Sequence, residues 1–174
     1  ILNADSMLSY PDFRSYERAY QLMAQVAGRA GRKNGKGLVV LQTKSPDLPV
    51  IHQVMNHDYE SMYQEQLEER RIFHYPPFYR LIYVYLKHRK QEVADEAADR
   101  MAELLRKGLW SRILGPDKPV VGRIQALFIK KIVVKVELEV SLKKVRTYLS
   151  EVQLCILEDE RFRSLVVYYD VDPY

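Results

Sequence analysis

The strongest constraint on the fold is a regular alternation of strand-like and helix-like patterns across residues 79–172. The strand-like segments are rich in β-branched and aromatic residues, and the helix-like segments repeat apolar residues every three or four positions. Six such segments follow one another: a strand at 79–88, a helix at 91–107, strands at 120–128 and 131–140, a helix at 142–156 and a strand at 165–171. The order β-α-β-β-α-β predicts an α+β fold, in which two helices cover one face of an antiparallel sheet.

The strand predicted at 131–140 indicates how this sheet meets water. Apolar Val134 and Val136 alternate with charged Lys135 and Glu137. Because successive side chains of a strand point to opposite faces, one face of the sheet should pack against the helices and the other should stay hydrated.

The chain contains 13 tyrosines. Five of them lie in the apolar patterns of predicted strands: Tyr79, Tyr83, Tyr85, Tyr168 and Tyr169. We expect such tyrosines to pack in the core with a bonded hydroxyl. The alternative is that an exposed subset stacks on unpaired bases, as aromatic residues on a sheet face do in proteins that bind single strands.

Upstream of this region the sequence predicts helices and one short strand. A helix from about residue 14 places six apolar residues on one buried face: Ala19, Leu22, Met23, Val26, Ala27 and Ala30. A buried strand is predicted at 38–43, and further helices at 49–56 and 59–73. Pro76 and Pro77 cannot continue a helix, so a domain boundary is expected within residues 74–78.

The most informative string is QVAGRAGR, at residues 25–32. At helical spacing Gln25, Arg29 and Arg32 share one face, and glycines are costly inside a helix unless another group approaches closely. Two guanidinium groups on such a face suit a polyphosphate. The alternative is the end of a glycine-containing helix with solvated arginines.

QVAGRAGR resembles the last conserved motif of superfamily 2 helicases, Q-x-x-G-R-x-G-R. Four further segments accompany it: PDFRSYERAYQLMA before it, residues 38–43 after it, then EERRIFHYPPFYRL, and DVDP at residues 170–173. Together they resemble the PriA family of primosomal replication-restart helicases, and the Tyr-Pro-Pro-Phe segment distinguishes this family from related translocases.

This resemblance implies roles for three residues in ATP chemistry. Gln25 would contact the nucleotide or the opposite helicase lobe, and Arg29 and Arg32 would sense the γ-phosphate, one of them as an arginine finger. ATP and magnesium would be cofactors of the longer parent protein, and zinc would bind outside this chain.

The resemblance also implies three parts. Residues 1–50 would be the C-terminal edge of a second RecA-like α/β lobe, 51–78 a helical connector, and 79–174 a C-terminal α+β domain. The sequence contains no P-loop string G-x-x-x-x-G-K-[ST], no acidic box for magnesium and no set of zinc cysteines. We therefore expect this chain to bind DNA and partner proteins rather than to hydrolyse ATP or unwind DNA, and to hold no metal or cofactor itself. Its single cysteine, Cys155, is expected to pack in a helix.

Basic residues give the chain a net charge of +4 and a pI of about 9.0, which permits binding to a polyanion without requiring it. They gather in three clusters: Arg32 and Lys33 with Lys36, Lys130 with Lys131, and Lys143 and Lys144 with Arg146. These are candidate contacts for DNA or partner proteins. The third cluster opens a helix and would hold a DNA phosphate or the acidic tail of a single-strand-binding protein. The alternative is an ordinary solvated face.

The expected function is the C-terminal part of an ATP-dependent 3'-5' DNA helicase that recognises stalled forks and restarts replication by primosome assembly. Expected partners are forked or junction DNA, single-strand-binding protein and other primosome proteins. No membrane is expected, because no run of about 18 apolar residues occurs, and a bacterial cytoplasmic location is predicted. Two alternatives stay open: an RNA-binding or ribosome-associated α+β module, and a purely structural interaction domain.

Overall fold

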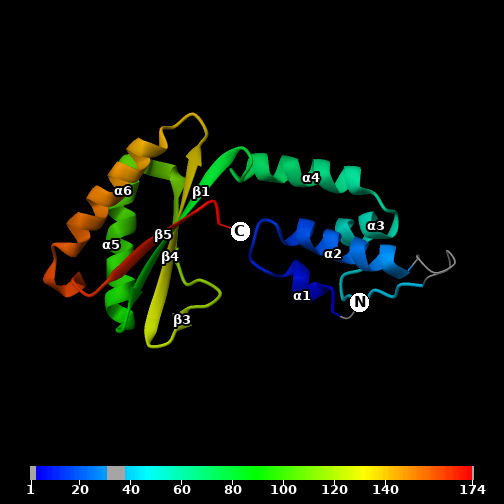
Figure 1. The fold of residues 1–174 in the computed structure, drawn as a ribbon, viewed down its shortest axis with the longest axis horizontal. Helices are drawn as coiled ribbons and strands as arrows, with labels where there is room; N and C mark the ends of the chain where they lie inside the picture. The colour runs from blue at the N-terminus through cyan, green and yellow to red at the C-terminus, as the bar shows by residue number, and fades with distance from the viewer. Residues whose placement is uncertain (1–2, 31–37, 174) are drawn as a thin grey trace. The chain divides into compact units, whose positions relative to one another are not determined.

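The computed structural model describes residues 3–30 and 38–173 and divides into two compact units, Ile1–Phe73 and His74–Tyr174 (Figure 1). Arg32, Lys33 and Lys36 lie outside the described residues, so what the sequence predicts for them stays a prediction. Each unit contains its own buried cluster of apolar side chains and is considered by itself.

The first unit is helical in its described residues. Its helices are α1 (Asp5–Leu8), α2 (Ser15–Ala30), α3 (Pro49–Met55) and α4 (Tyr59–Ile72). Pro49 opens α3, where its missing N–H leaves no bond unmade, and the Asp58 carboxylate caps α4 by accepting from the Ser61 N–H at 3.0 Å. One core joins these helices, made by Ala4, Ala19, Tyr20, Met23, Val50, Ile51, Val54 and Met62.

The strand predicted at 38–43 is wrong. Within the described residues this segment forms no strand ladder, and Leu38 and Val40 are 88% and 67% exposed. One backbone bond that holds it runs from the Ala4 N–H to the Gln42 carbonyl, at 3.0 Å. Apolar and β-branched residues favour a strand only where another strand supplies hydrogen bonds and a surface to pack on.

The buried face predicted for α2 is only partly correct. Ala19 and Met23 are fully buried, whereas Leu22 and Val26 are 50% and 44% exposed. Helical spacing identifies side chains that share a face, but it does not tell how far the neighbouring elements extend along that face.

The second unit has the predicted α+β class. In chain order it contains β1 (Tyr79–His88), α5 (Gln91–Leu109), η1 (Trp110–Arg112), β2 (Ile113–Asp117), β3 (Arg123–Ile124), β4 (Leu127–Glu137), α6 (Leu142–Leu157), η2 (Glu160–Phe162) and β5 (Val166–Val171). The sheet has the order β2-β4-β1-β5, with β3 paired to β4, and all its pairings are antiparallel. The fold class is therefore confirmed.

Two strand boundaries differ from the prediction. The strand predicted at 120–128 is mostly wrong, because only Arg123–Ile124 pairs there and β4 already begins at Leu127. The turn predicted from Gly115-Pro116-Asp117 is instead part of β2, which pairs with β4 through a register shift after Leu114. Gly115 adopts a φ of 91°, a conformation that favours glycine, so a turn-like sequence is accommodated as an irregularity inside a strand.

Helices α5 and α6 lie side by side over one face of this sheet (Figure 1). Val84 and Leu86 of β1 and Ile132 and Val134 of β4 project into the core beneath them, and all four are fully buried. Ala94, Ala97, Ala98 and Ala102 give α5 a narrow inner face, which lets the helix approach the strands closely. Because the helices cover one face only, the alternate residues of the strands form a second face, which is open except at Leu81 and Ile129, whose side chains are 0% and 4% exposed.

Candidate functional site

The described part of the QVAGRAGR string forms the last two turns of α2. Gln25 and Arg29 are exposed there, and a side chain added at Gly28 would meet no atom within 4 Å. Within the described residues no group makes the close approach that the glycines suggest. The two side chains are therefore available to a ligand, or to another protein segment, beyond this unit.

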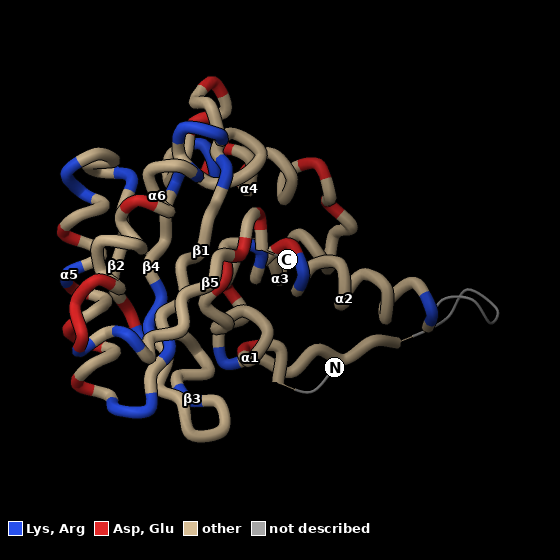
Figure 2. Tube along the Cα trace, turned by 60° about the vertical axis from the view of Figure 1, so that its left-hand side comes forward, with Lys and Arg blue, Asp and Glu red and all other residues tan. Residues whose placement is uncertain are grey.

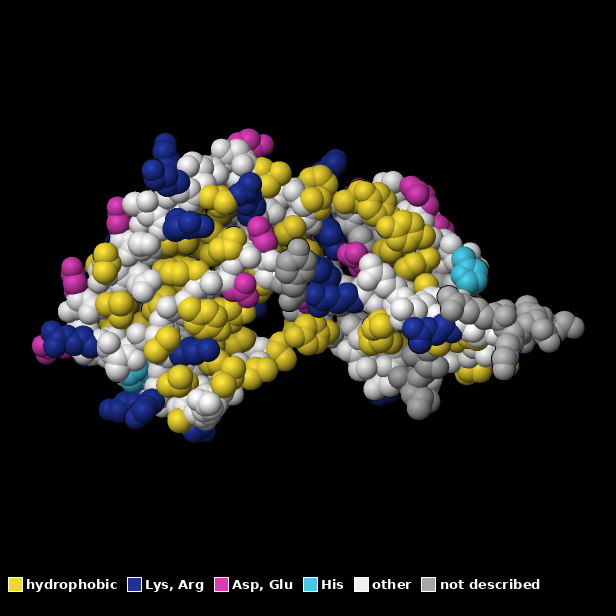
Figure 3. Space-filling view, viewed as in Figure 1, with side chains coloured by type: hydrophobic (Ala, Val, Ile, Leu, Met, Phe, Trp, Pro, Cys, Tyr) yellow, Lys and Arg dark blue, Asp and Glu magenta, His cyan; other side chains and the backbone are white. Residues whose placement is uncertain are grey.

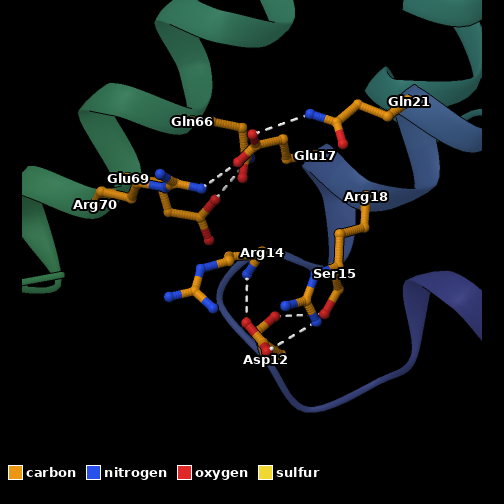
Figure 4. Close-up of polar contacts among 9 residues, drawn as sticks. All are labelled: Asp12, Arg14, Ser15, Glu17, Arg18, Gln21, Gln66, Glu69 and Arg70. Atoms are coloured by element: carbon orange, nitrogen blue, oxygen red, sulfur yellow. Dashed lines mark hydrogen bonds and ion pairs between the residues drawn. The ribbon is translucent and has the colours of Figure 1, made fainter. Parts of the chain in front are cut away.

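The opposite end of α2 is held by a set of polar contacts (Figure 4). The Asp12 carboxylate accepts from the Arg14 N–H at 2.8 Å and pairs with Arg18 at 3.1 Å, and the Ser15 hydroxyl donates to the Asp12 carbonyl. Arg70 of α4 pairs with Glu17 of α2, and its side chain is only 16% exposed. These contacts fix where the helix starts, and hence the direction in which its last turn presents the motif.

In the second unit, the open face of the sheet carries tyrosine and lysine side chains. The alternation along each strand places on it Tyr83, Tyr85 and Lys87 of β1, Lys131, Val133 and Lys135 of β4, and Tyr168 and Asp170 of β5. Leu81 and Ile129 share this alternation but are buried. Tyr85 stands opposite both Lys131 and Tyr168 in the register. We call this set the open sheet face.

The tyrosines of the open sheet face contact one another. The rings of Tyr85 and Tyr168 are stacked, with centroids 4.7 Å apart and planes 12° apart. Tyr83 meets Tyr85 edge to face at 6.2 Å. Tyr168 is 37% exposed, and none of the three belongs to the core under the helices. The expectation that they pack in the core is therefore wrong.

Lysines lie over these rings. The Lys87 Nζ lies 4.4 Å from the ring centroid of Tyr168, and the Lys131 Nζ lies 4.6 Å from that of Tyr83. Both distances are within the range of attraction between a cation and an aromatic ring. Lys135 lies over Tyr75 at 3.7 Å, and burial lowers the pKa of its ammonium.

The structure separates the basic residues that the sequence groups together. Lys130 faces the helix side of β4 and pairs with Asp95 of α5 at 3.0 Å, whereas Lys131 belongs to the open sheet face. Lys143, Lys144 and Arg146 are all exposed on α6. The tube view shows how the basic residues are spread along these strands and helices (Figure 2).

A pocket of about 270 Å³ lies between α6 and β5, on the helix side of the sheet. It is lined by Ile82, Leu142, Arg146, Leu149, Ser150, Tyr169 and Val171. Figure 3 shows hydrophobic side chains gathered between these two elements, with basic side chains beside them. An apolar floor with an arginine at its rim can accept an apolar side chain that lies next to a carboxylate.

Tyr169 lines this pocket and packs against the core with a bonded hydroxyl, as the sequence predicts. Its hydroxyl donates to the Gln153 side chain at 2.8 Å and lies 3.2 Å from the Leu149 carbonyl. Burial raises the pKa of Tyr169 to about 12. Cys155, by contrast, is exposed, so the prediction that it packs is wrong: it falls on the outer side of α6, next to the buried Ile156.

Two searches of the described residues bear on the class of site. Among these residues, no group of three or more His, Cys, Asp and Glu side chains is arranged to hold a metal ion. No described helix is long and apolar enough to cross a membrane.

Comparisons with known proteins agree with the resemblance seen in the sequence. Residues 71–174 match the family model described as the primosomal protein N C-terminal domain. The replication restart protein PriA of Bacillus subtilis is 34% identical over 176 aligned positions, which cover 100% of this chain and 22% of that protein. PriA of Chlamydia pneumoniae is 40% identical over 111 positions, which cover 64% of this chain and 15% of that protein.

A third relative, PriA of Treponema pallidum, is 37% identical over 134 positions, which cover 76% of this chain and 20% of that protein. The chain thus spans about a fifth of the length of the curated relatives that it matches. The family match covers more than half of the chain and includes the whole second unit. On this basis, the chain belongs to the family of primosomal protein N C-terminal domains.

Proposed function

We propose that the chain is the C-terminal part of an ATP-dependent 3'-5' DNA helicase that recognises stalled replication forks and restarts replication by primosome assembly. The observation that carries the proposal is the pairing, in one chain, of a helicase-like motif, whose Gln25 and Arg29 are exposed on α2, with a domain of the primosomal family. The relatives are named replication restart proteins, which supports the same biological process.

In this proposal the end of α2 forms one side of an ATP site. Arg29 and Arg32 would bind the γ-phosphate and stabilise the charge that develops during its transfer, and Gln25 would contact the nucleotide or the opposite lobe. ATP and magnesium would be held mainly by parts of the longer protein that carry a P-loop, and zinc by a cysteine set outside this sequence. The exposure of Gln25 and Arg29 fits such a shared site.

The arginine assignment is tested in the full-length protein by Arg29→Ala, with Arg18→Ala as a control on the same helix. Loss of an arginine that contacts the γ-phosphate should lower the ATPase rate by about 10³-fold or more while leaving fork binding intact. Arg18 pairs with Asp12 at the other end of α2, so its loss should leave ATPase turnover nearly unchanged. Unchanged turnover in Arg29→Ala would remove the proposed role.

The chain itself would act as a DNA-binding and partner-binding module in the bacterial cytoplasm. The candidate contacts for DNA or for partner proteins are Lys33, Lys36, Lys130, Lys131, Lys143, Lys144 and Arg146. A binding assay with forked DNA, duplex DNA and single-stranded RNA over a salt series separates the alternatives. Preference for the fork, with affinity that falls steeply with salt, supports the proposal. Saturable preference for RNA would favour an RNA-binding or ribosome-associated module instead.

A second candidate function is supported by the pocket between α6 and β5: capture of the acidic tail of a single-strand-binding protein. Arg146 lines this apolar pocket, and Lys143 and Lys144 are exposed on the preceding turn of α6. A charged hydrogen bond to a carboxylate beside a buried apolar side chain gives both affinity and orientation.

This capture is tested with a labelled peptide of that tail and the variant Arg146→Ala. Removing one partner of a buried charged contact should weaken binding at least about tenfold. Arg163→Ala is the matched control, because Arg163 is an exposed arginine on the segment that joins η2 to β5 and does not line the pocket. Equal loss in both variants would indicate general charge attraction and remove the pocket assignment.

A further inference from the structure

We propose that the open sheet face of residues 74–174 is a stacking platform for single-stranded DNA, centred on Tyr168. This inference rests on the proposed DNA-binding function and deepens it, because it names the form of DNA and the surface that takes it. Apart from Lys131, it uses residues that the charge clusters of the sequence do not include.

The stacked rings of Tyr85 and Tyr168 form the centre of the proposed platform. Tyr85 and Tyr168 face each other across β1 and β5, 4.7 Å between centroids and 12° between planes. In the sheet order β2-β4-β1-β5, β5 is the last strand, so the side of Tyr168 that does not meet Tyr85 lies at the sheet edge. Tyr168 is 37% exposed. A flat base can extend this stack at the sheet edge without any rearrangement of the strands, once the Lys87 ammonium that lies over the Tyr168 ring turns to the phosphate of that nucleotide.

Two lysines place positive charge beside this stack. The Lys87 Nζ lies 4.4 Å from the Tyr168 centroid, so the phosphate of a nucleotide stacked on Tyr168 comes within reach of that ammonium. Lys131 stands opposite Tyr85 on the other side of β1, with its Nζ 4.6 Å from the Tyr83 ring. A lysine thus accompanies the rings on both sides of β1, which suits a chain of linked phosphates.

Acidic groups also lie on or beside the open sheet face and decide which part of it attracts phosphate. Glu137 is paired with Arg112 at 2.7 Å, and the Asp172 carboxylate accepts from the Leu81 N–H at 3.0 Å. Asp170 is exposed and stands opposite Tyr83, and Asp117 stands opposite Lys131 on the edge strand β2. Charge therefore favours the end of the ring row near Lys87 and opposes the end near Asp170.

These features favour a single strand over a duplex. A base can stack on a protein ring only when its own face is open, and in a duplex both faces are covered by neighbouring bases. A merely basic surface would attract both forms. Aromatic rings with intervening lysines therefore predict selectivity for unpaired DNA that depends on the base as well as on the phosphate.

The test uses the full chain and a fluorescein-labelled oligothymidylate, followed by fluorescence anisotropy. Tyr168→Ala should weaken binding about tenfold, whereas Tyr168→Phe, which keeps the ring, should bind like the unmodified chain. Tyr63→Ala is the matched control, because Tyr63 is similarly exposed, at 42%, but lies on α4 of the first unit. Asp170→Asn should tighten binding about two- to threefold, because it removes a like charge beside the strand.

An abasic oligomer of the same length separates stacking from charge. It should bind about as weakly to the unmodified chain as the thymidylate does to Tyr168→Ala, and equal affinity for the two oligomers would overturn the platform. If the chain binds forked DNA but Tyr168→Ala changes nothing, the platform fails while the proposed function stands. If the chain binds no DNA in any form, the proposed function fails as well.

Photocrosslinking covers the case in which Tyr168→Ala does not fold. The unmodified chain is irradiated with a bromodeoxyuridine oligomer and the crosslinked peptides are identified. Crosslinks on the peptide that contains Tyr168 or on the peptide that contains Tyr85 support the platform. Crosslinks confined to other parts of the chain would overturn it.

Discussion

The two units use their apolar residues in different ways. In the second unit the apolar residues of β1, β4, α5 and α6 meet in one core, and its largest members are fully buried. In the first unit, α2 buries Ala19 and Met23 but leaves Leu22 and Val26 about half exposed. A helical period therefore tells which residues share a face, and only the tertiary neighbours decide whether that face becomes a core.

The largest test of this comparison is a pair of truncations. Phe162→Ala in the second unit removes a side chain that is 0% exposed, and it should lower the free energy of unfolding by about 3–5 kcal/mol. Leu22→Ala in the first unit removes a side chain that is 50% exposed, and it should cost less than about 1 kcal/mol. Urea unfolding followed by far-UV circular dichroism measures both. Equal costs would mean that the exposed face of α2 is covered in solution, and the comparison would fail.

A smaller effect is expected from one hydroxyl in each unit. Tyr169→Phe removes hydrogen bonds to Gln153 and Leu149 beside α6, and it should cost about 1 kcal/mol. Tyr63→Phe is the control in the first unit: its ring stacks on Tyr59 in an exposed position, so its loss of a hydroxyl should stay within about 0.5 kcal/mol. The same urea titrations apply. A larger loss in Tyr63→Phe would show that the first unit depends on polar contacts more than the second does.

The smallest effect is expected from pH, through one carboxylate in each unit. Contacts with Arg161 and Arg100 hold the pKa of Asp159 far below its usual value, and hydrogen bonds from Thr43 and Lys44 lower the pKa of Asp5. A group whose pKa is lower in the folded state stabilises the fold above its unfolded pKa. The contribution is then lost as pH falls below about 4 toward the folded pKa.

The urea midpoint of each unit should therefore fall between pH 5 and pH 3. Asp159→Asn should flatten this dependence in the second unit, and Asp5→Asn should flatten it in the first. Asp99→Asn, an exposed position on α5, serves as the control. If the urea midpoint falls equally with pH in all three variants, the pH dependence belongs to other groups.

The comparison also shows which parts of the fold are accessible from sequence. Helices α5 and α6 and strand β1 have clear periods of 3.6 and 2, and their prediction agrees with the structure. Strand β2 was hidden by Gly115-Pro116, because turn residues inside a bulged strand look like a turn. The segment at 38–43 has strand-forming residues, but a strand also needs a partner, which residue type alone does not supply.

The two candidate sites, the motif on α2 and the open sheet face, could not be predicted equally well from the sequence. The motif on α2 was found from spacing, and the structure describes Gln25 and Arg29 but not Arg32. For the tyrosines of the open sheet face, core packing was the first expectation and exposure the alternative, because tyrosine counts as apolar and Tyr83 and Tyr85 alternate with Val84 and Leu86. The signal was present in the alternation of YRLIYVYLKH, which assigns Leu81, Tyr83, Tyr85 and Lys87 to one face and Ile82, Val84 and Leu86 to the other.

The neighbouring residues Lys130 and Lys131 show how this alternation affects the evolution of the two faces of the sheet. One pairs with Asp95 beneath the helices and the other lies over Tyr83 on the open sheet face. Two adjacent codons thus belong to two separate surfaces, so a single-base change can alter the charge of one surface while the other is left intact. An insertion or deletion of one residue in the turn that precedes β4 could shift the register of β4 by one position. Each lysine would then lie on the opposite face of the sheet, and both surfaces would change at once.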